Sequence, residues 1–143
     1  MSLRARIQDA VMLWENGRRE GAFLSALIAV AATSRRRYLD RQAVRDREAF
    51  ERFLTDAISV RLSVEYRGEC HAIEHVLYKW LRCELVHEGG LPVNIEFLAD
   101  DGLSVRAGGA PEYVLKISRG WFRHLINSVV TAPENCDLFP RGH

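Results

Sequence analysis

The chain has 143 residues, 48% of them apolar, and a formal net charge of +1 at pH 7. This length supports one domain with a hydrophobic core, and the near-neutral charge excludes the uniformly basic coat of many nucleic-acid-binding proteins. No apolar run reaches the roughly 18 residues of a membrane-spanning helix. No signal-peptide pattern opens the chain, so we expect no membrane segment. Three widely spaced cysteines, Cys70, Cys83 and Cys136, argue against a disulfide framework and predict a cytoplasmic protein.

The first part of the chain predicts three helices. Apolar residues at helical spacing indicate a first helix over about 3–16, with Gly17 as a suitable C-terminal cap. A second helix over about 19–37 has a broad apolar face, which is typical of a central helix. Asp46 is a good N-cap for a third helix. The apolar stripe of this third helix consists of Phe50, Phe53, Leu54, Ala57 and Ile58.

The middle of the chain predicts one more helix. Residues 60–66 alternate weakly, which predicts either a short strand or an extended link. A fourth helix is predicted over about 70–88 and is closed by the pair 89–90, Gly-Gly. Pro92 prevents its continuation because proline has no backbone N–H.

Beyond Pro92 the pattern is typical of strands. Residues 93–97 and 103–106 alternate with a period of two around a turn at 100–102, which predicts a β-hairpin. Residues 113–117 are consistent with a third strand, and Ser118 is expected to cap a last helix. The apolar face of that helix consists of Phe122, Leu125, Ile126 and Val129.

These elements predict a mainly α fold. It is an antiparallel helical bundle with a small β-hairpin, about 93–117, inserted before the last helix. A single domain is expected over 1–131. The prolines and glycine that follow Thr131 predict a loose C-terminal tail over 132–143.

Arg82 and His87 lie five residues apart near the end of the predicted fourth helix. Arginine offers a fixed charge and a planar fork of donors suited to phosphate, and histidine exchanges protons near neutrality. Together they suggest phosphodiester chemistry without a metal. On a straight helix the two side chains point about 140° apart. Either the last turn deforms at the glycine pair or a second copy of the chain completes the site. By spacing alone, a helix-end histidine with a structural role is the alternative.

The segment Leu77-Tyr78-Lys79-Trp80-Leu81-Arg82-Cys83-Glu84-Leu85-Val86-His87-Glu88-Gly89 resembles the HEPN superfamily (higher eukaryotes and prokaryotes nucleotide-binding). The hallmark of that superfamily is an arginine and a histidine, separated by four to six residues, near the end of a core helix. Many members are dimeric, metal-independent ribonucleases of toxin–antitoxin and antiphage systems, and others only bind. The resemblance implies a homodimer that acts on RNA or nucleotide without a cofactor. Any antitoxin would be a separate protein.

The resemblance also implies a role for each member of the pair. Arg82 would bind the scissile phosphate and stabilise its developing charge. His87 would be general base or acid in the attack of the ribose 2′-OH, which leaves a cyclic phosphate. Active members commonly have a polar residue after the motif arginine, where this chain has Cys83. This departure keeps open a non-catalytic module that binds RNA, nucleotide or a partner protein.

Further arginines gather between residues 35 and 47, and such a cluster can neutralise phosphates. The alternative is an ordinary solvated helix end and loop. The weaker substrate-binding candidates are therefore Tyr78, Lys79 and Glu84 beside the pair, and Arg35, Arg36, Arg37 and Arg41 in the cluster.

One further motif suggests a metal. His71-Ala72-Ile73-Glu74-His75 matches H-x-x-E-H, in which two histidines one helical turn apart hold zinc and the glutamate acts as base. Peptidases with this motif are far larger and take a further acidic ligand from a distant helix, so we predict no metal site. Arg119 and His124 are also five residues apart, like Arg82 and His87. His124 is predicted to be an exposed surface residue.

Overall fold

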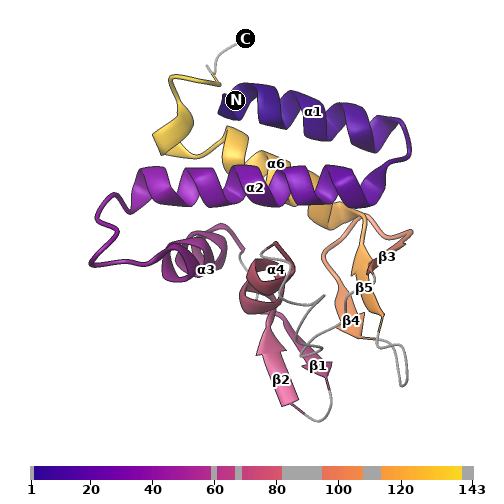
Figure 1. Cartoon of the computed structure of the whole chain (residues 1–143). Coiled ribbons are helices and arrows are strands. Elements are labelled where there is room, and N and C mark those ends of the chain that lie inside the picture. Colours follow the sequence, from indigo (N-terminus) through magenta and orange to yellow (C-terminus); the bar gives the residue numbers. More distant parts are fainter. Residues whose placement is uncertain (1, 59–60, 67–68, 82–94, 108–113, 140–143) are drawn as a thin grey trace. The chain divides into compact units, whose positions relative to one another are not determined.

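The structure is a computed structural model that describes residues 2–58, 61–66, 69–81, 95–107 and 114–139 (Figure 1). Over these residues the chain is mainly helical with two small sheets, as the sequence predicts. It divides into two compact units, one made of residues 1–57 and 122–143 and the other of residues 58–121, where the sequence predicts one domain. None of the described helices is long and apolar enough to cross a membrane.

The first unit begins with two helices that lie side by side (Figure 1). Helix α1 spans Leu3–Glu15 and begins where the Ser2 hydroxyl accepts a hydrogen bond, 3.1 Å long, from the Ala5 N–H. It ends before Gly17, whose φ of 77° lies in the left-handed region that favours glycine. Helix α2 spans Arg19–Arg37, so both predicted helices are confirmed. The wholly buried apolar residues of α2 are Ala22, Phe23, Ala26, Leu27, Ala29 and Val30.

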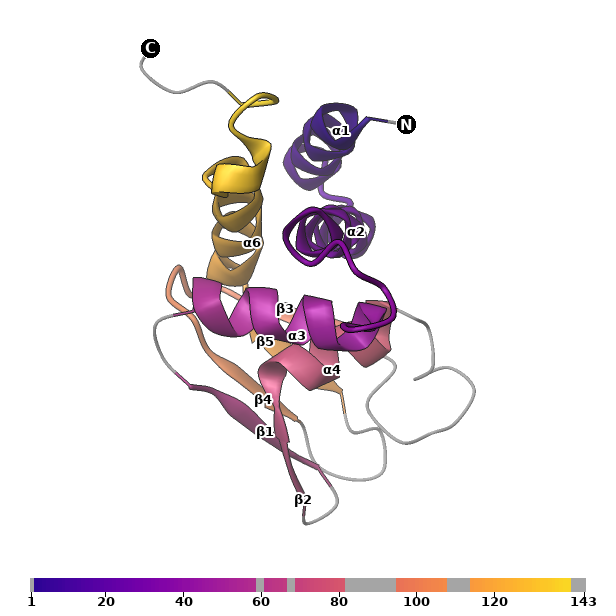
Figure 2. The ribbon, with the colours of Figure 1, turned by 90° about the vertical axis from the view of Figure 1, so that its left-hand side faces the viewer.

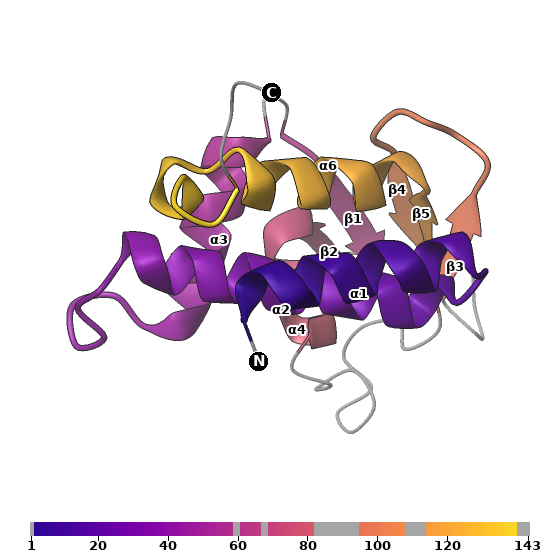
Figure 3. The same ribbon diagram turned by 90° about the horizontal axis from the view of Figure 1, so that it is seen from above.

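Two more helices complete this unit. Helix α3 spans Asp46–Ala57, and helix α6 spans Gly120–Val130. Asp46 is the first helical residue of α3, where a carboxylate also suits the positive end of the helix dipole. Figure 2 shows α1, α2 and α6 nearly end-on, and Figure 3 shows α6 running alongside α2. Trp14 and Phe122 stack between α1 and α6, with ring centroids 4.3 Å apart.

Residues 132–139 are held in place, so the predicted loose tail is wrong for this segment. Pro133–Asn135 form the short helix η1, because proline suits the first turn of a helix. Asn135 is fully buried, and its amide nitrogen donates hydrogen bonds to Thr33 Oγ1 (3.0 Å) and to the Val129 carbonyl (2.8 Å). Its amide oxygen accepts from Arg36 Nη1 at 2.8 Å. The prolines predict a loose tail, but the hydrogen bonds of the buried Asn135 amide fix this segment to α2 and α6.

In the second unit, the first residues of the predicted fourth helix form a strand. Strand β1 spans Ser63–Tyr66 and pairs antiparallel with β2, Glu69–Ala72. Helix α4 therefore begins at Ile73 and is described to Leu81, so the predicted start at residue 70 is wrong. Residues 70–72 pair with β1 and so belong to the sheet. Of the two alternatives predicted for residues 60–66, a short strand or an extended link, the structure has the strand, β1.

The second sheet differs from the predicted hairpin. Strands β3 (Ile95–Leu98), β4 (Val105–Ala107) and β5 (Leu115–Ser118) lie in the order β3-β5-β4. Strand β5 is parallel to β3 and antiparallel to β4, so β3 and β4 do not pair with each other and the hairpin prediction is wrong. Leu115 and Ile117 are fully buried, whereas the described residues of β3 and β4 are partly exposed. The most buried strand, β5, thus takes the centre of the sheet.

Ser118 has a different role from the predicted helix cap. It ends β5, and its hydroxyl donates to the Gly102 carbonyl (2.7 Å) and accepts from the Ser104 N–H (2.9 Å). This fastens the turn at 100–102 to the end of the central strand. A Cβ at Gly120 would collide with the Asp101 and Gly102 carbonyl oxygens, so this close approach requires glycine.

Candidate functional site

The predicted catalytic pair, Arg82 and His87, lies outside the described residues, as does Glu84. Helix α4 is described up to Leu81, the residue directly before Arg82. Its buried residues are Ile73, Val76, Leu77 and Trp80, and within its unit the helix contacts β1 and β2.

Tyr78 and Lys79 lie half-buried on α4, so they belong to the second unit. The arginine cluster belongs to the first unit. The predicted substrate-binding residues are thus divided between two units.

The four candidate arginines of the cluster, Arg35, Arg36, Arg37 and Arg41, have acidic partners within the first unit. Arg35 donates to the Val44 carbonyl (2.7 Å) and lies 3.4 Å from Asp46, which also pairs with Arg41 at 3.4 Å. Arg36 lies 3.3 Å from Asp137. These contacts link the side chains to neighbouring segments of the first unit, and their role as phosphate contacts stays a prediction.

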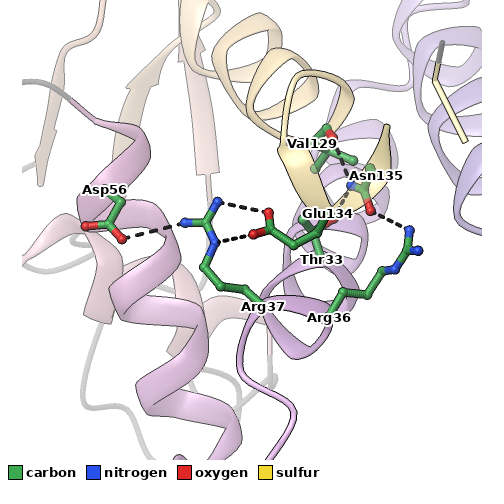
Figure 4. Close-up of polar contacts among 7 residues, drawn as sticks. All are labelled: Thr33, Arg36, Arg37, Asp56, Val129, Glu134 and Asn135. Carbon is green, nitrogen blue, oxygen red and sulfur yellow. Dashed lines mark hydrogen bonds and ion pairs between the residues drawn. The ribbon is translucent and has the colours of Figure 1, made fainter. Parts of the chain in front are cut away.

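Arg37 has the most complete set of contacts (Figure 4). Its Nε and Nη2 donate to the two carboxylate oxygens of Glu134, both at 3.0 Å, which is a bidentate pair. A third nitrogen lies 3.6 Å from Asp56, and the guanidinium sits over the Phe53 ring, 4.7 Å from its centroid. The hydrogen bond with Glu134 raises the pKa of Arg37, and the same bond lowers the pKa of Glu134.

A groove of about 290 Å³ opens beside Arg37 within the first unit. Residues from the end of α2, from α3, from α6 and from the segment after α6 form its walls. They are Arg37, Phe53, Asp56, Ala57, His124, Asn127, Ser128, Thr131, Ala132 and Pro133.

His124 lines this groove, so the prediction that it is an exposed surface residue is wrong. The side chain is half-buried, and its Nε2 atom is shielded from solvent. Sequence reasoning also missed Asp56, Asn127 and Ser128. The signal for them was weak, because Asn127 and Ser128 are ordinary polar positions on a predicted helix.

The histidines of the H-x-x-E-H motif do not share a helix. His71 lies in β2 and His75 in α4, and their rings are nearly parallel with centroids 6.2 Å apart. His71 lies 3.8 Å from Glu69. Within the described part of the chain, no three histidine, cysteine or acidic side chains gather in a way that could hold a metal ion.

The sequence profile of the family described as Rv1289 matches residues 2–71. The match covers α1, α2, α3 and β1, and ends inside β2, before α4 and the Arg82–His87 pair. No curated protein and no solved structure matches the chain.

Proposed function

We propose that the chain is a HEPN-type endoribonuclease that cleaves RNA without a metal and acts as a homodimer. In this proposal Arg82 binds the scissile phosphate and His87 moves the proton of the attacking 2′-OH. The observation that carries it is the position of the pair, which begins one residue after the described end of α4. The proposal includes the finer fold predicted from the sequence, an antiparallel HEPN-like bundle around the motif helix.

The dimer follows from the angle between the two side chains. If the helix continues through the motif, Arg82 and His87 point about 140° apart and cannot reach one phosphate from the same chain. A two-fold interface lets Arg82 of one copy act with His87 of the other. We expect light scattering coupled to gel filtration to give twice the chain mass of 16.3 kDa. A monomer at enzyme-assay concentration that still cleaves RNA would contradict this arrangement.

The second candidate is a non-catalytic module that binds RNA or nucleotide through the same segment. Cys83 favours it, because active relatives commonly have a polar residue there.

The deciding experiment incubates structured and single-stranded RNAs with the wild-type chain, Arg82→Ala and His87→Ala in EDTA. We expect wild-type cleavage with cyclic phosphate ends. His87→Ala should lose about 10²–10⁴-fold in rate because it lacks the proton-transfer group. Arg82→Ala should lose phosphate binding and rate together.

Matched controls separate this result from general damage. Arg106→Ala removes an exposed arginine of β4, and His71→Ala removes a histidine of the rejected zinc motif. Both should cleave RNA as the wild type does. Cleavage abolished by EDTA and by His71→Ala would move the chemistry to a metal. Tight RNA binding without cleavage would favour the binding module.

A further inference from the structure

The turn between α1 and α2 contains the only Asn-Gly pair of the sequence, Asn16 and Gly17, and shares no residue with the proposed ribonuclease site. An asparagine side chain loses ammonia when the backbone nitrogen of the next residue attacks its amide carbon. Glycine allows this attack most readily, because it has no Cβ to crowd the nitrogen and its backbone rotates freely. Asn16 is exposed, and a Cβ built at Gly17 would meet no atom within 4 Å. The space in which a new ring would form is therefore open.

Two hydrogen bonds hold the reacting groups in the folded turn. Asn16 Nδ2, the nitrogen that would leave, donates to the Met12 carbonyl at 2.7 Å. The Gly17 N–H, whose nitrogen would attack, donates to the Trp14 carbonyl at 3.1 Å. Together with the positive φ of Gly17, these bonds form the cap that ends α1. Ring closure turns both groups away from these acceptors, so it proceeds only while the turn is open.

From this chemistry and this geometry we propose that Asn16 is a site of spontaneous deamidation, and that its conversion loosens the cap of α1. The Gly17 nitrogen forms a bond to Asn16 Cγ, the bond from Cγ to Nδ2 breaks, and Nδ2 leaves as ammonia with the Gly17 proton. Water then opens the succinimide ring at either of its carbonyls. One product is aspartate, and the other is isoaspartate, in which the main chain runs through the side-chain carbon.

Both products weaken the end of α1. The carboxylate of an aspartate at position 16 is an acceptor only, so it cannot donate to the Met12 carbonyl. Its negative charge also lies at the C-terminal end of the helix dipole, where anions are unfavourable. Isoaspartate lengthens the main chain by one atom and so moves Gly17 out of the cap position. The turn lies between Trp14 and Arg19, whose guanidinium sits 5.0 Å from the Trp14 ring centroid, so either product affects the contact of α1 with α2.

The test stores the full chain at pH 8 and follows deamidation by mass spectrometry of tryptic peptides. Trypsin releases residues 7–18, which contain Asn16, and residues 124–141, which contain Asn127 and Asn135. Neither of the latter asparagines precedes a glycine, so we expect deamidation in residues 7–18 well before it occurs in residues 124–141. In urea the first peptide should react several-fold faster, because the bonds of the cap are absent. The ratio of the two rates measures how rarely the turn opens.

Two pairs of variants separate the chemistry from its effect on stability. Gly17→Ala should slow the reaction in urea several-fold, because its Cβ crowds the attacking nitrogen, whereas Gly21→Ala should react as the wild type does. Asn16→Asp should lower the melting temperature by a few degrees. Asn127→Asp, the same change on the exposed side of α6, should lower it less.

Three results would overturn the proposal. The first is deamidation of residues 7–18 in the folded chain that is no faster than that of residues 124–141. The second is an unchanged rate in urea for Gly17→Ala. The third is a melting temperature of Asn16→Asp equal to that of the wild type.

Discussion

Within each unit, side-chain hydrogen bonds join residues at very different separations along the chain. In the first unit, Asn135 bonds to Thr33 across 102 positions of the chain, and Arg37 bonds to Glu134 across 97. In the second unit, Ser118 bonds to Gly102 across 16 positions and Arg119 to Asp101 across 18. Closing a longer loop costs more conformational entropy. The first unit therefore depends on a few long-range polar contacts, whereas the second depends on backbone ladders and short turns.

Removing the buried amide should break the first unit most severely. In Asn135→Ala, the partners Thr33, Val129 and Arg36 all lose a hydrogen bond. Each unpaired buried group costs about 1–3 kcal/mol, so we expect a loss of about 3 kcal/mol in the free energy of unfolding. Urea unfolding measures the total, and hydrogen exchange should show the loss in α2 and α6.

The same exchange experiment tests the comparison itself. Protection in β4 and β5 should change less than protection in α2 when Asn135 is replaced. Asn127→Ala, on the exposed side of α6, is the control and should leave both units unchanged within about 0.5 kcal/mol. Equal loss of protection in both units would mean that they unfold together.

A methyl group at Gly120 should damage the second unit. In Gly120→Ala the new Cβ meets backbone carbonyl oxygens at 101 and 102, so the turn or the start of α6 has to shift. Overpacking of this kind costs about 1–3 kcal/mol, seen as faster exchange in β4 and β5. Gly21→Ala is the matched control, because its Cβ meets only the Leu13 side chain at 3.9 Å. That helical change should stabilise the chain by up to about 1 kcal/mol.

The Arg37–Glu134 pair should make the first unit sensitive to acid. The pKa of Glu134 in the folded chain lies below its ordinary value of 4.5. Its contribution is therefore fully present above about pH 4.5 and is lost as pH falls through the folded pKa. Both side chains are about one-quarter exposed, at 25% and 23%, so we expect roughly 1 kcal/mol.

Glu134→Gln should remove this contribution and flatten the acid limb of stability against pH. Glu48→Gln is the control, since Glu48 and Arg52 form an exposed pair one helical turn apart. Surface pairs of this kind contribute about 0.3–0.5 kcal/mol. An equal change in the acid limb for both variants would show that the long-range pair has no special weight.

The smallest effect is expected at Arg119. Its bond to Asp101 raises the pKa of Arg119, but the pair is open to solvent, with 41% of the Arg119 side chain and 81% of the Asp101 side chain exposed. Solvent screens such a pair, so Arg119→Ala should leave the melting temperature unchanged within error. A clear drop would show that the short turn at 100–102 depends on this ion pair as well as on Ser118.

The helices of the first unit could be predicted because their signal is local. Apolar residues three and four positions apart mark α1, α2, α3 and α6, and each was found within a few residues of its observed bounds. Sheet pairing is not local. The alternation at 93–97 and 103–106 indicated strands correctly, but the choice of β5 as their common neighbour depends on burial across the whole unit.

The residues of the candidate site also differ in whether their signal is local in the sequence. Arg82 and His87 were identifiable because their side-chain chemistry and their spacing lie in one short segment. The acidic partners of the arginine cluster were not, because Glu134 and Asp137 lie almost a hundred residues further along the chain. The apolar stripe of its own helix predicts an exposed His124, and that pattern carries no information about α3 and the segment after α6, which line the same groove.

The first unit is discontinuous in sequence, and residues 58–121 come between its two parts. A ribosome adds about 5–20 residues per second and releases the chain from its N-terminus. Every strand of the second unit leaves the ribosome before η1 does, so that unit can fold first. Helices α1–α3 meanwhile lack Asn135 and most of α6, and the apolar face that α6 covers stays open to solvent. Translation speed and chaperone contact during this interval therefore act on the first unit, even though its first residues are the earliest to be made.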